Sequence, residues 1–260
     1  MDLLEAWASW ESDAPPLVLD DDLRVLQRPR SRWALVNHSG WQDAVAQPDF
    51  CAPNDTRLHL GLLPQPFIGD VRNASVYVLL LNPGLAPSDY YGEYEVQEYR
   101  AALSANLKQR SSDGAIPFLF LDPRFAWHGG FTWWHGKLAK VIAQLSIAWD
   151  VSFAEARARL GSALASIELI PYHSAAFRDQ GGWLKELHSV TLARAFVGDF
   201  VLPRVERGQA IVIVTRKVAV WDLPKHPGVV AYSPSQARAA HLTPESPGGT
   251  AILKHLTGLP

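Results

Sequence analysis

The chain alternates short apolar runs with polar loops, and this pattern predicts strands that end in functional side chains. The first run, residues 76–81, is continuously apolar and is followed at once by Asn82-Pro83-Gly84. A short apolar run that stops at a turn signal is typical of a strand buried on both faces. Open parallel sheets bind their ligands at the carboxyl ends of the strands. Asn82 therefore stands where a binding or catalytic group is expected.

Three further segments repeat this plan of a strand followed by a polar loop. They are residues 167–170 before Pro171-Tyr172-His173-Ser174, 210–214 before Thr215-Arg216-Lys217, and 229–232 before Ser233-Pro234-Ser235. Between the strands, apolar residues recur at the spacing of a helix face. These residues are Trp134, Leu138, Val141, Ile142 and Leu145, then Phe153, Leu160 and Leu164, and finally Leu184, Leu187 and Phe196.

The order strand, helix, strand, helix predicts an α/β fold. We expect a three-layer α/β/α sandwich with a central, mostly parallel four-stranded sheet. If the strands are parallel, right-handed crossovers place all four polar loops at one edge of the sheet. The sequence thus predicts one composite cleft at that edge.

The segments outside this pattern differ in character. Residues 1–65 hold four tryptophans among acidic clusters, which predicts an N-terminal extension packed on an α/β domain of residues 66–260. Residues 88–114 are polar and rich in tyrosine, and they predict a loop and a helix beside the cleft, with a mobile turn around Ser111-Ser112-Asp113.

Composition limits the classes of function. With 260 residues and 48% hydrophobic content, the chain can bury a large core. The net charge of −2 provides no global basic field for nucleic acid. Cys51 is the only cysteine, which excludes an internal disulfide and fits a reducing, cytoplasmic setting. The start lacks a signal-peptide pattern and no apolar run reaches membrane-spanning length, so we expect a soluble protein with no membrane partner.

Several kinds of chemistry lack their motifs. Neither G-x-x-x-x-G-K-[ST] nor G-x-G-x-x-G occurs, which argues against a nucleotide-phosphate enzyme. The nucleophile elbow G-x-S-x-G is also missing. The histidines are scattered rather than spaced as metal ligands. We therefore expect neither a cofactor nor a metal.

Three motifs follow one another along the chain in an order that resembles a known protein family. Asn82-Pro83-Gly84-Leu85 follows the first strand, Trp133-Trp134-His135-Gly136-Lys137-Leu138 opens a helix, and Ser233-Pro234-Ser235-Gln236-Ala237-Arg238 follows the last strand. This order resembles the uracil-DNA glycosylase superfamily, and most of all its mismatch-specific uracil- and thymine-DNA glycosylase branch, with G-x-N-P-G-L, F-W-K and N-P-S-G-x-S-R. Residues 66–70 look like the lead-in of many bacterial members. The resemblance covers roughly residues 64–257.

The resemblance implies DNA repair by base excision, in which the N-glycosidic bond of a flipped-out uracil or related base is hydrolysed. It implies that Asn82 positions the attacking water and that Ser233 donates a hydrogen bond to the departing base. The implied substrate contacts are Pro83, Gly84, Tyr90, Tyr91, Phe131, Trp133, Trp134, Tyr172 and His173. The implied contacts to DNA, single-stranded or mismatched, are Ser235, Gln236 and Arg238.

Each of these residues also has a structural interpretation. Asn82 is a common turn residue, aromatic side chains at a helix start often belong to the core, and Arg238 is compatible with a solvated position after a turn. His173 alone is more often a hydrogen-bonded loop residue than a catalyst.

The chain departs from the family pattern at two places. Ser233 stands where the family has His or Asn, and a neutral hydroxyl donates less strongly to a developing anion. The Asn that reads uracil in many members is missing near residues 169–171, so Tyr172 or His173 would have to recognise a different ring. These departures keep an alternative open: a weak or inactive relative that binds a base, nucleotide or nucleic acid, or that recruits a protein partner.

Overall fold

The protein consists of two compact units, each assembled from three stretches of chain. The computed structural model describes residues 2–12, 14–29, 34–110, 114–179, 182–237 and 240–258. The first unit comprises residues 1–66, 81–110 and 168–196, and the second comprises 67–80, 111–167 and 197–260.

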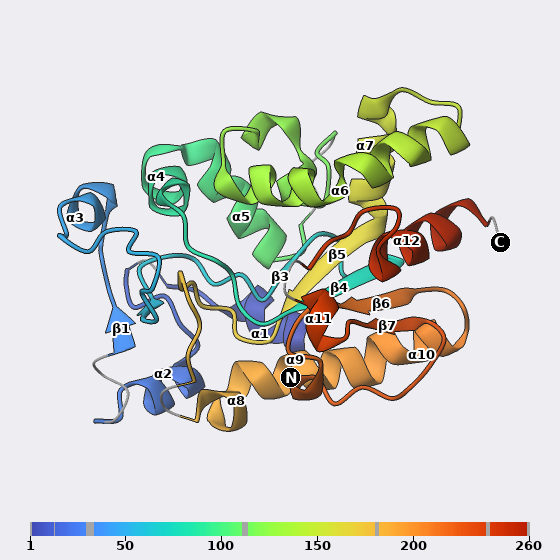
Figure 1. Ribbon diagram of the computed structural model, residues 1–260. Helices are drawn as coiled ribbons and strands as arrows, with labels where there is room; N and C mark the ends of the chain where they lie inside the picture. The colour runs from blue at the N-terminus through green and yellow to red at the C-terminus, as the bar shows by residue number, and fades with distance from the viewer. Residues whose placement is uncertain are drawn as a thin grey trace. The chain divides into compact units, whose positions relative to one another are not determined.

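The second unit holds a mostly parallel five-stranded sheet (Figure 1). Its strands stand in the order β3 (Phe67–Ile68), β5 (Leu164–Glu168), β4 (Val76–Leu80), β6 (Ile211–Val214) and β7 (Val229–Ala231). Strand β6 runs parallel to both β4 and β7, whereas β3 pairs with β5 in the antiparallel sense. All residues of β4 and β6 except Leu80 are buried, as the continuous apolar runs predict.

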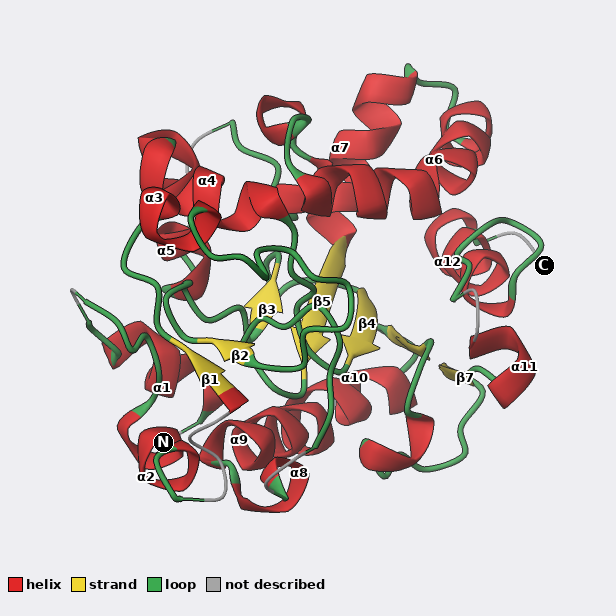
Figure 2. Ribbon diagram, turned by 60° about the vertical axis from the view of Figure 1, so that its left-hand side comes forward, coloured by secondary structure: helices red, strands yellow, loops and turns green. Residues whose placement is uncertain are grey.

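Helices cover both faces of this sheet. Figures 1 and 2 show α6 (Gly129–Ala148), α7 (Phe153–Ala163) and α12 (Pro247–Thr257) over one face and α10 (Leu202–Glu206) over the other. The apolar stripe predicted on α6 is buried throughout. The remaining helical segments of this unit are η2 (Leu119–Leu121), η3 (Pro123–Phe125), the π-helical η4 (Val197–Val201), η5 (Val218–Val220) and α11 (Pro234–Ala237).

The first unit is mainly helical. Helices α1 (Leu3–Ser9), α2 (Asp20–Leu26) and α8 (Trp183–Glu186) each contact α9 (His188–Phe196). A second group consists of α3 (Trp41–Val45), α4 (Pro87–Glu95) and α5 (Gln97–Leu107), packed in that order. Two short parallel strands, β1 (Leu35–Val36) and β2 (Leu58–His59), complete the unit.

A buried carboxylate ties the N-terminal helices to distant parts of the first unit. Asp22 is fully buried, its Oδ2 accepts a hydrogen bond from the Tyr172 hydroxyl at 2.7 Å, and its Oδ1 accepts one from the Ser189 amide at 3.1 Å. Burial raises the pKa of Asp22, although these hydrogen bonds act against the rise. Helix α2 is thus joined to distant parts of this unit by specific polar contacts. The division into a packed N-terminal extension of residues 1–65 and an α/β domain of residues 66–260 stays a prediction.

The sequence-based expectation of an α/β fold with a mostly parallel sheet is confirmed, with two differences. The sheet has five strands instead of four, because the two-residue β3 adds an antiparallel edge that is too short to leave a pattern. The strand expected at 167–170 lies at 164–168. The turn expected around residues 111–113 lies outside the described residues.

Among the helices that the structure describes, not one is long and apolar enough to span a lipid bilayer.

Gly69 allows a test of this packing. Its φ of +101° lies where L-residues are strained, and a Cβ there would meet the Leu164 carbonyl oxygen at 2.5 Å. We expect Gly69→Ala to lower the free energy of unfolding by about 2–4 kcal/mol. Urea denaturation followed by circular dichroism measures this change.

Gly136→Ala is the matched control, because Gly136 lies within α6 and a Cβ there would meet nothing within 4 Å. This variant should gain about 0.5–1 kcal/mol from helix propensity. Equal denaturation midpoints for both variants would contradict the assigned backbone conformation of Gly69.

Candidate functional site

The Asn82 side chain is held in one orientation within the first unit. Its Nδ2 donates hydrogen bonds to the Pro83 carbonyl at 2.8 Å, to the Tyr172 carbonyl at 3.3 Å and to the Ser174 hydroxyl at 2.8 Å. Carbonyl oxygens only accept hydrogen bonds, so the atom facing them is the amide nitrogen. The Oδ1 atom accepts no hydrogen bond from the described residues, and Asn82 is partly exposed. This side chain therefore presents a fixed acceptor.

The loop at 171–174 supports the Asn82 turn along its backbone. The Ser174 amide donates to the Pro83 carbonyl at 3.2 Å, and the Ile170 amide donates to the Leu81 carbonyl at 2.9 Å. His173 is buried, and its Nδ1 lies 2.8 Å from the Gly84 carbonyl oxygen. Because that oxygen can only accept, Nδ1 carries the proton. The turn is thus fixed on both sides of Asn82.

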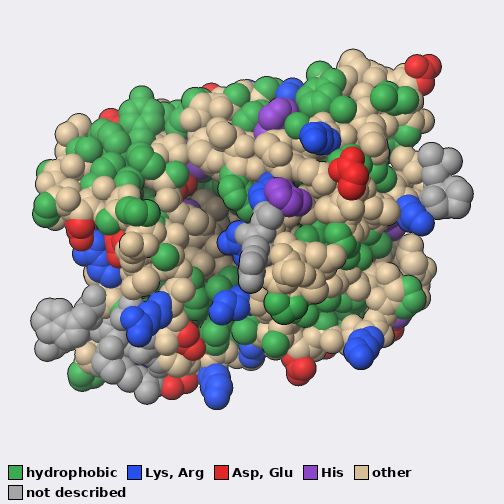
Figure 3. Space-filling model, viewed as in Figure 1, with side chains coloured by type: hydrophobic (Ala, Val, Ile, Leu, Met, Phe, Trp, Pro, Cys, Tyr) green, Lys and Arg blue, Asp and Glu red, His purple; other side chains and the backbone are tan. Residues whose placement is uncertain are grey.

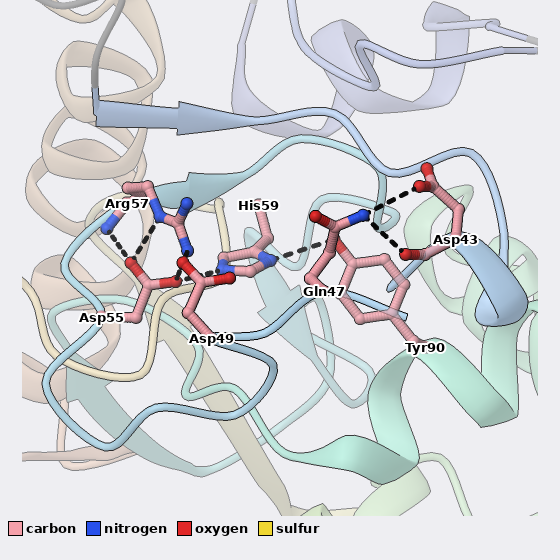
Figure 4. A network of polar contacts seen from close by, with 7 residues as sticks. All are labelled: Asp43, Gln47, Asp49, Asp55, Arg57, His59 and Tyr90. Carbon is pink, nitrogen blue, oxygen red and sulfur yellow. Dashed lines mark hydrogen bonds and ion pairs between the residues drawn. The ribbon is translucent and has the colours of Figure 1, made fainter. Parts of the chain in front are cut away.

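A second polar network, centred on His59, is joined to this loop by a backbone hydrogen bond (Figure 4). The His59 amide donates to the His173 carbonyl at 2.9 Å. The His59 ring lies between Asp55 and Tyr90. Its Nε2 is 3.2 Å from Asp55 Oδ2, and its Nδ1 is 3.0 Å from the Tyr90 hydroxyl oxygen. Arg57 makes a two-point contact with Asp55 at 2.9 and 2.7 Å and also binds Asp49.

The electrostatics of this network assign its protons. Burial acts to raise the pKa of Asp55, but hydrogen bonds from Arg57 outweigh it and lower the pKa to about 2. Burial lowers the pKa of His59 to about 4, against the opposing effect of Asp55. His59 is therefore neutral near pH 7, with Nε2–H donating to Asp55 and Nδ1 accepting from Tyr90.

This arrangement of carboxylate, imidazole and hydroxyl has the order of a catalytic triad, but it serves packing. Tyr90 has no exposed surface, and burial raises the pKa of its hydroxyl above the ordinary value for tyrosine. A nucleophile needs access to substrate and a lowered pKa. Tyr91, by contrast, is 44% exposed and packs edge-on against Trp41. Of the two tyrosines expected to face a base, only Tyr91 presents surface to solvent.

Three other expected contact residues of the first unit, namely Pro83, Tyr172 and His173, are buried. Tyr172 is 1% exposed and its hydroxyl binds Asp22, and His173 is 2% exposed. Gly84 is exposed, and a Cβ added there would meet no atom within 4 Å. Open space therefore lies at Gly84. Contact of these residues with a base stays a prediction.

The aromatic segment belongs to the second unit, and its members differ in exposure. Phe131 and Trp134 are buried, and Trp134 packs edge-on against Phe118 at 4.8 Å between ring centroids. Trp133 is 43% exposed, and the ammonium of Lys137 lies 5.3 Å from its ring centroid. Trp133 is therefore the member of this segment that can meet a ligand on the surface.

The turn after β7 is exposed and internally hydrogen-bonded. The Ser233 amide and hydroxyl both donate to Gln236 Oε1, at 2.9 and 3.0 Å, and Ser233 Oγ lies 3.0 Å from Ser235 Oγ. Because Oε1 accepts both of these hydrogen bonds, the amide nitrogen of Gln236 is the part of this side chain that can donate to a ligand. Arg238 lies outside the described residues. Because Asn82 and this turn belong to different units, the composite cleft also stays a prediction.

Within the described ranges, no group of three or more His, Cys, Asp and Glu side chains is placed to hold a metal ion.

Comparison with known proteins provides no relative: no family model, curated protein or solved structure matches this chain.

Sequence reasoning missed Asp55, Arg57 and His59. Their spacing of two residues is the period of an extended chain, which places alternate side chains on one side. Polar residues that alternate in this way directly ahead of an apolar run could have indicated that these three side chains form one cluster.

The low pKa of His59 predicts a pH dependence of stability. A histidine has a pKa of 6.5 when unperturbed and about 4 here, so between these values the unfolded chain binds more protons than the folded one. The free energy of unfolding should therefore fall as the pH is lowered from 6.5 towards 4. His59→Gln, which retains a donor and an acceptor, should lose this contribution, up to about 1.4 kcal/mol per pH unit.

Urea titrations between about pH 7 and pH 5 compare the two slopes and stay above the range in which Asp55 titrates. Identical slopes for the parent and His59→Gln would show that other groups take up the proton.

Proposed function

We propose that this protein is a DNA glycosylase that hydrolyses the N-glycosidic bond of a flipped-out damaged or deaminated base, uracil or a relative of it. Asn82 positions the attacking water. The reaction has an oxocarbenium-like transition state, so a correctly placed water and a stabilised departing base are the main requirements.

The anchored amide of Asn82 is the observation that carries this proposal. Three acceptors hold Nδ2, and Oδ1 is left to accept a hydrogen bond from water. An amide oxygen orients water but does not take its proton fully, so slow hydrolysis is expected. The exposed Gly84 next to it leaves room for a ligand.

The departing base would receive its hydrogen bond from Ser233. That hydroxyl has one proton, which points to Gln236 Oε1 or to Ser235 in the free protein. Donation to a base would cost one of these bonds. This competition adds to the weakness of a neutral donor and again favours slow turnover.

The engaged hydroxyl of Ser233 also favours a second candidate function, namely binding of a base, nucleotide or nucleic acid without hydrolysis. In this alternative, Asn82 holds the turn and recognises a ligand but does not direct a water, and a protein partner supplies any downstream activity.

Excision assays distinguish the two candidates. End-labelled single- and double-stranded oligonucleotides holding uracil, hypoxanthine, xanthine or mismatched thymine are incubated with excess protein, and abasic sites are cleaved chemically. We expect product from one of the damaged bases, and we expect Asn82→Ala to lower the single-turnover rate by about 100-fold or more, because the water loses its acceptor.

Asn54→Ala is the matched control, since Asn54 is exposed and belongs to the same unit. Its rate should equal that of the parent. Absence of product on every substrate, with folded protein confirmed by circular dichroism, would refute the glycosylase proposal and favour binding without hydrolysis.

Ser174→Ala tests the orientation of the amide separately. It removes one of the three acceptors of Asn82 Nδ2 and leaves the two carbonyl groups in place. The single-turnover rate should fall by about 2- to 10-fold, the value of one net hydrogen bond. Ser162→Ala, which removes a hydroxyl that bonds only within α7, should leave the rate unchanged. A rate for Ser174→Ala equal to that of the parent would mean that the hydroxyl does not help to orient Asn82.

A further inference from the structure

One surface of the second unit combines an exposed aromatic ring with closely spaced cations. Trp133 and Lys137 lie one turn apart on α6, and Lys140 follows on the same face. Residues 129–148 hold two lysines and no Asp or Glu, so this helix adds no negative charge of its own. We call Trp133, Lys137 and Arg216 the α6 surface.

The indole of Trp133 packs against a buried aromatic side chain. It packs edge-on against Trp134, with 4.9 Å between ring centroids and an interplanar angle of 83°. Trp134 is buried against Phe118. Trp133 nevertheless remains 43% exposed. A large apolar ring held rigidly at the surface costs little further conformational entropy when a ligand stacks on it.

One cation lies over this ring, and a second cation acts on the first. The Lys137 ammonium lies 5.3 Å from the Trp133 ring centroid. Burial, and then the charge of Arg216, lower the pKa of Lys137, so Arg216 lies within electrostatic range of that ammonium. Arg216 itself is exposed, in the loop after β6. Glu245, whose pKa is lowered by hydrogen bonds from its own backbone and from Thr243 and by the charge of Lys140, gives Lys140 an acidic neighbour.

Hydrogen-bond donors lie at the same edge of the sheet. Strands β6 and β7 are parallel with Val214 opposite Ala231, so the loops that follow them leave the sheet side by side. These loops carry Arg216 and the exposed Ser233–Gln236 turn. Figure 3 shows this face of the molecule, on which Lys and Arg side chains reach the surface at several places.

We propose that the α6 surface binds single-stranded nucleic acid, with an unstacked base on the Trp133 ring and the neighbouring phosphates at Lys137 and Arg216. The chemistry matches both parts of the ligand, because every base has a π-face and every linkage carries a negative charge.

A duplex fits this surface less well. The faces of its bases are covered by neighbouring bases, so an exposed indole cannot stack on a base of a duplex until that base is unstacked. Duplex binding also relies on an extended basic track, whereas this chain has a net charge of −2 and two cations at this point. The surface therefore selects unpaired strands. This inference deepens the proposed function by naming its substrate class, but it needs no hydrolysis.

Fluorescence anisotropy with labelled oligonucleotides free of damaged bases tests the binding directly. The probes are a 12-mer of deoxythymidine, the same length of uridine, and a mixed-sequence DNA duplex. We expect the single strands to bind more tightly than the duplex. Trp133→Ala should weaken single-strand binding about 10-fold, and Trp133→Phe should restore most of it.

The charges are tested by salt dependence. The double variant Lys137→Gln/Arg216→Gln should lower the slope of log K against log salt by about 1.4, the value for two phosphate contacts on a single strand.

The chain contains a matched control pair. Trp149 also carries a cation over its ring, Arg159 at 5.8 Å, and it lies 16 residues along the helix direction, about 24 Å from Trp133. Trp149→Ala and Arg159→Gln should bind the single strands as the parent does. Circular dichroism confirms that each variant is folded.

The outcomes separate this proposal from the glycosylase proposal. Asn54→Ala should bind the single strands with the affinity of the parent, and binding by the parent protein without excision would support the α6 surface while refuting hydrolysis. Binding of either the deoxythymidine or the uridine strand with loss in Trp133→Ala supports the proposal, and the tighter of the two identifies the preferred sugar. Equal affinity for the duplex, or equal losses in Trp133→Ala and Trp149→Ala, would overturn it. So would Trp133-dependent binding to phosphatidylserine vesicles or to a poly-glutamate peptide but not to either strand.

Discussion

The hydrogen bonds between the turn after β4 and the loop at 171–174 determine what the first unit can do. Two main-chain carbonyls, those of Pro83 and Tyr172, accept from the Asn82 amide, and so they decide which end of that amide faces outward. The Ser174 amide returns a hydrogen bond to Pro83, and the His173 ring holds Gly84. Because these contacts come from backbone groups and buried side chains, the orientation of Asn82 is set before any ligand arrives.

The network around His59 explains why that loop keeps its place. Asp55 is held as a carboxylate by Arg57, His59 is held neutral by burial, and Tyr90 donates the last hydrogen bond. A buried network is stabilising only when its members are satisfied, and here each hydrogen bond has a defined donor and acceptor. The His59 amide then donates a hydrogen bond to the His173 carbonyl, which fixes the loop to this network. In the same unit, the hydrogen bond from Tyr172 to Asp22 holds this loop a second time.

The apolar pattern of the sequence predicted much of the sheet and little of the site. Runs 76–81 and 210–214 became β4 and β6, because continuous burial on both faces demands continuous apolar sequence. Run 229–232 became β7, although its residues are only half-buried or exposed. The run 167–170 predicted the wrong strand bounds, because Leu169 and Ile170 are fully buried although the strand ends at Glu168. An apolar residue indicates burial, but it does not indicate that the residue is paired in a sheet. The two-residue β3 was too short to form a pattern. Asn82 was found because a turn residue after a strand is visible in the sequence. The partners of Asn82, and the Asp55–His59–Tyr90 contacts, join segments far apart in the chain, and spacing along a sequence does not report such contacts.

The central claim is that Asn82 presents a fixed, water-accepting oxygen. A high-resolution crystal structure of the ligand-free protein tests it most directly. The account predicts an ordered water about 2.7–3.2 Å from Asn82 Oδ1, with Nδ2 on the Pro83 and Tyr172 carbonyls and the Ser174 hydroxyl. An Oδ1 atom occupied by a protein donor, or an amide turned away from the two carbonyls, would contradict it.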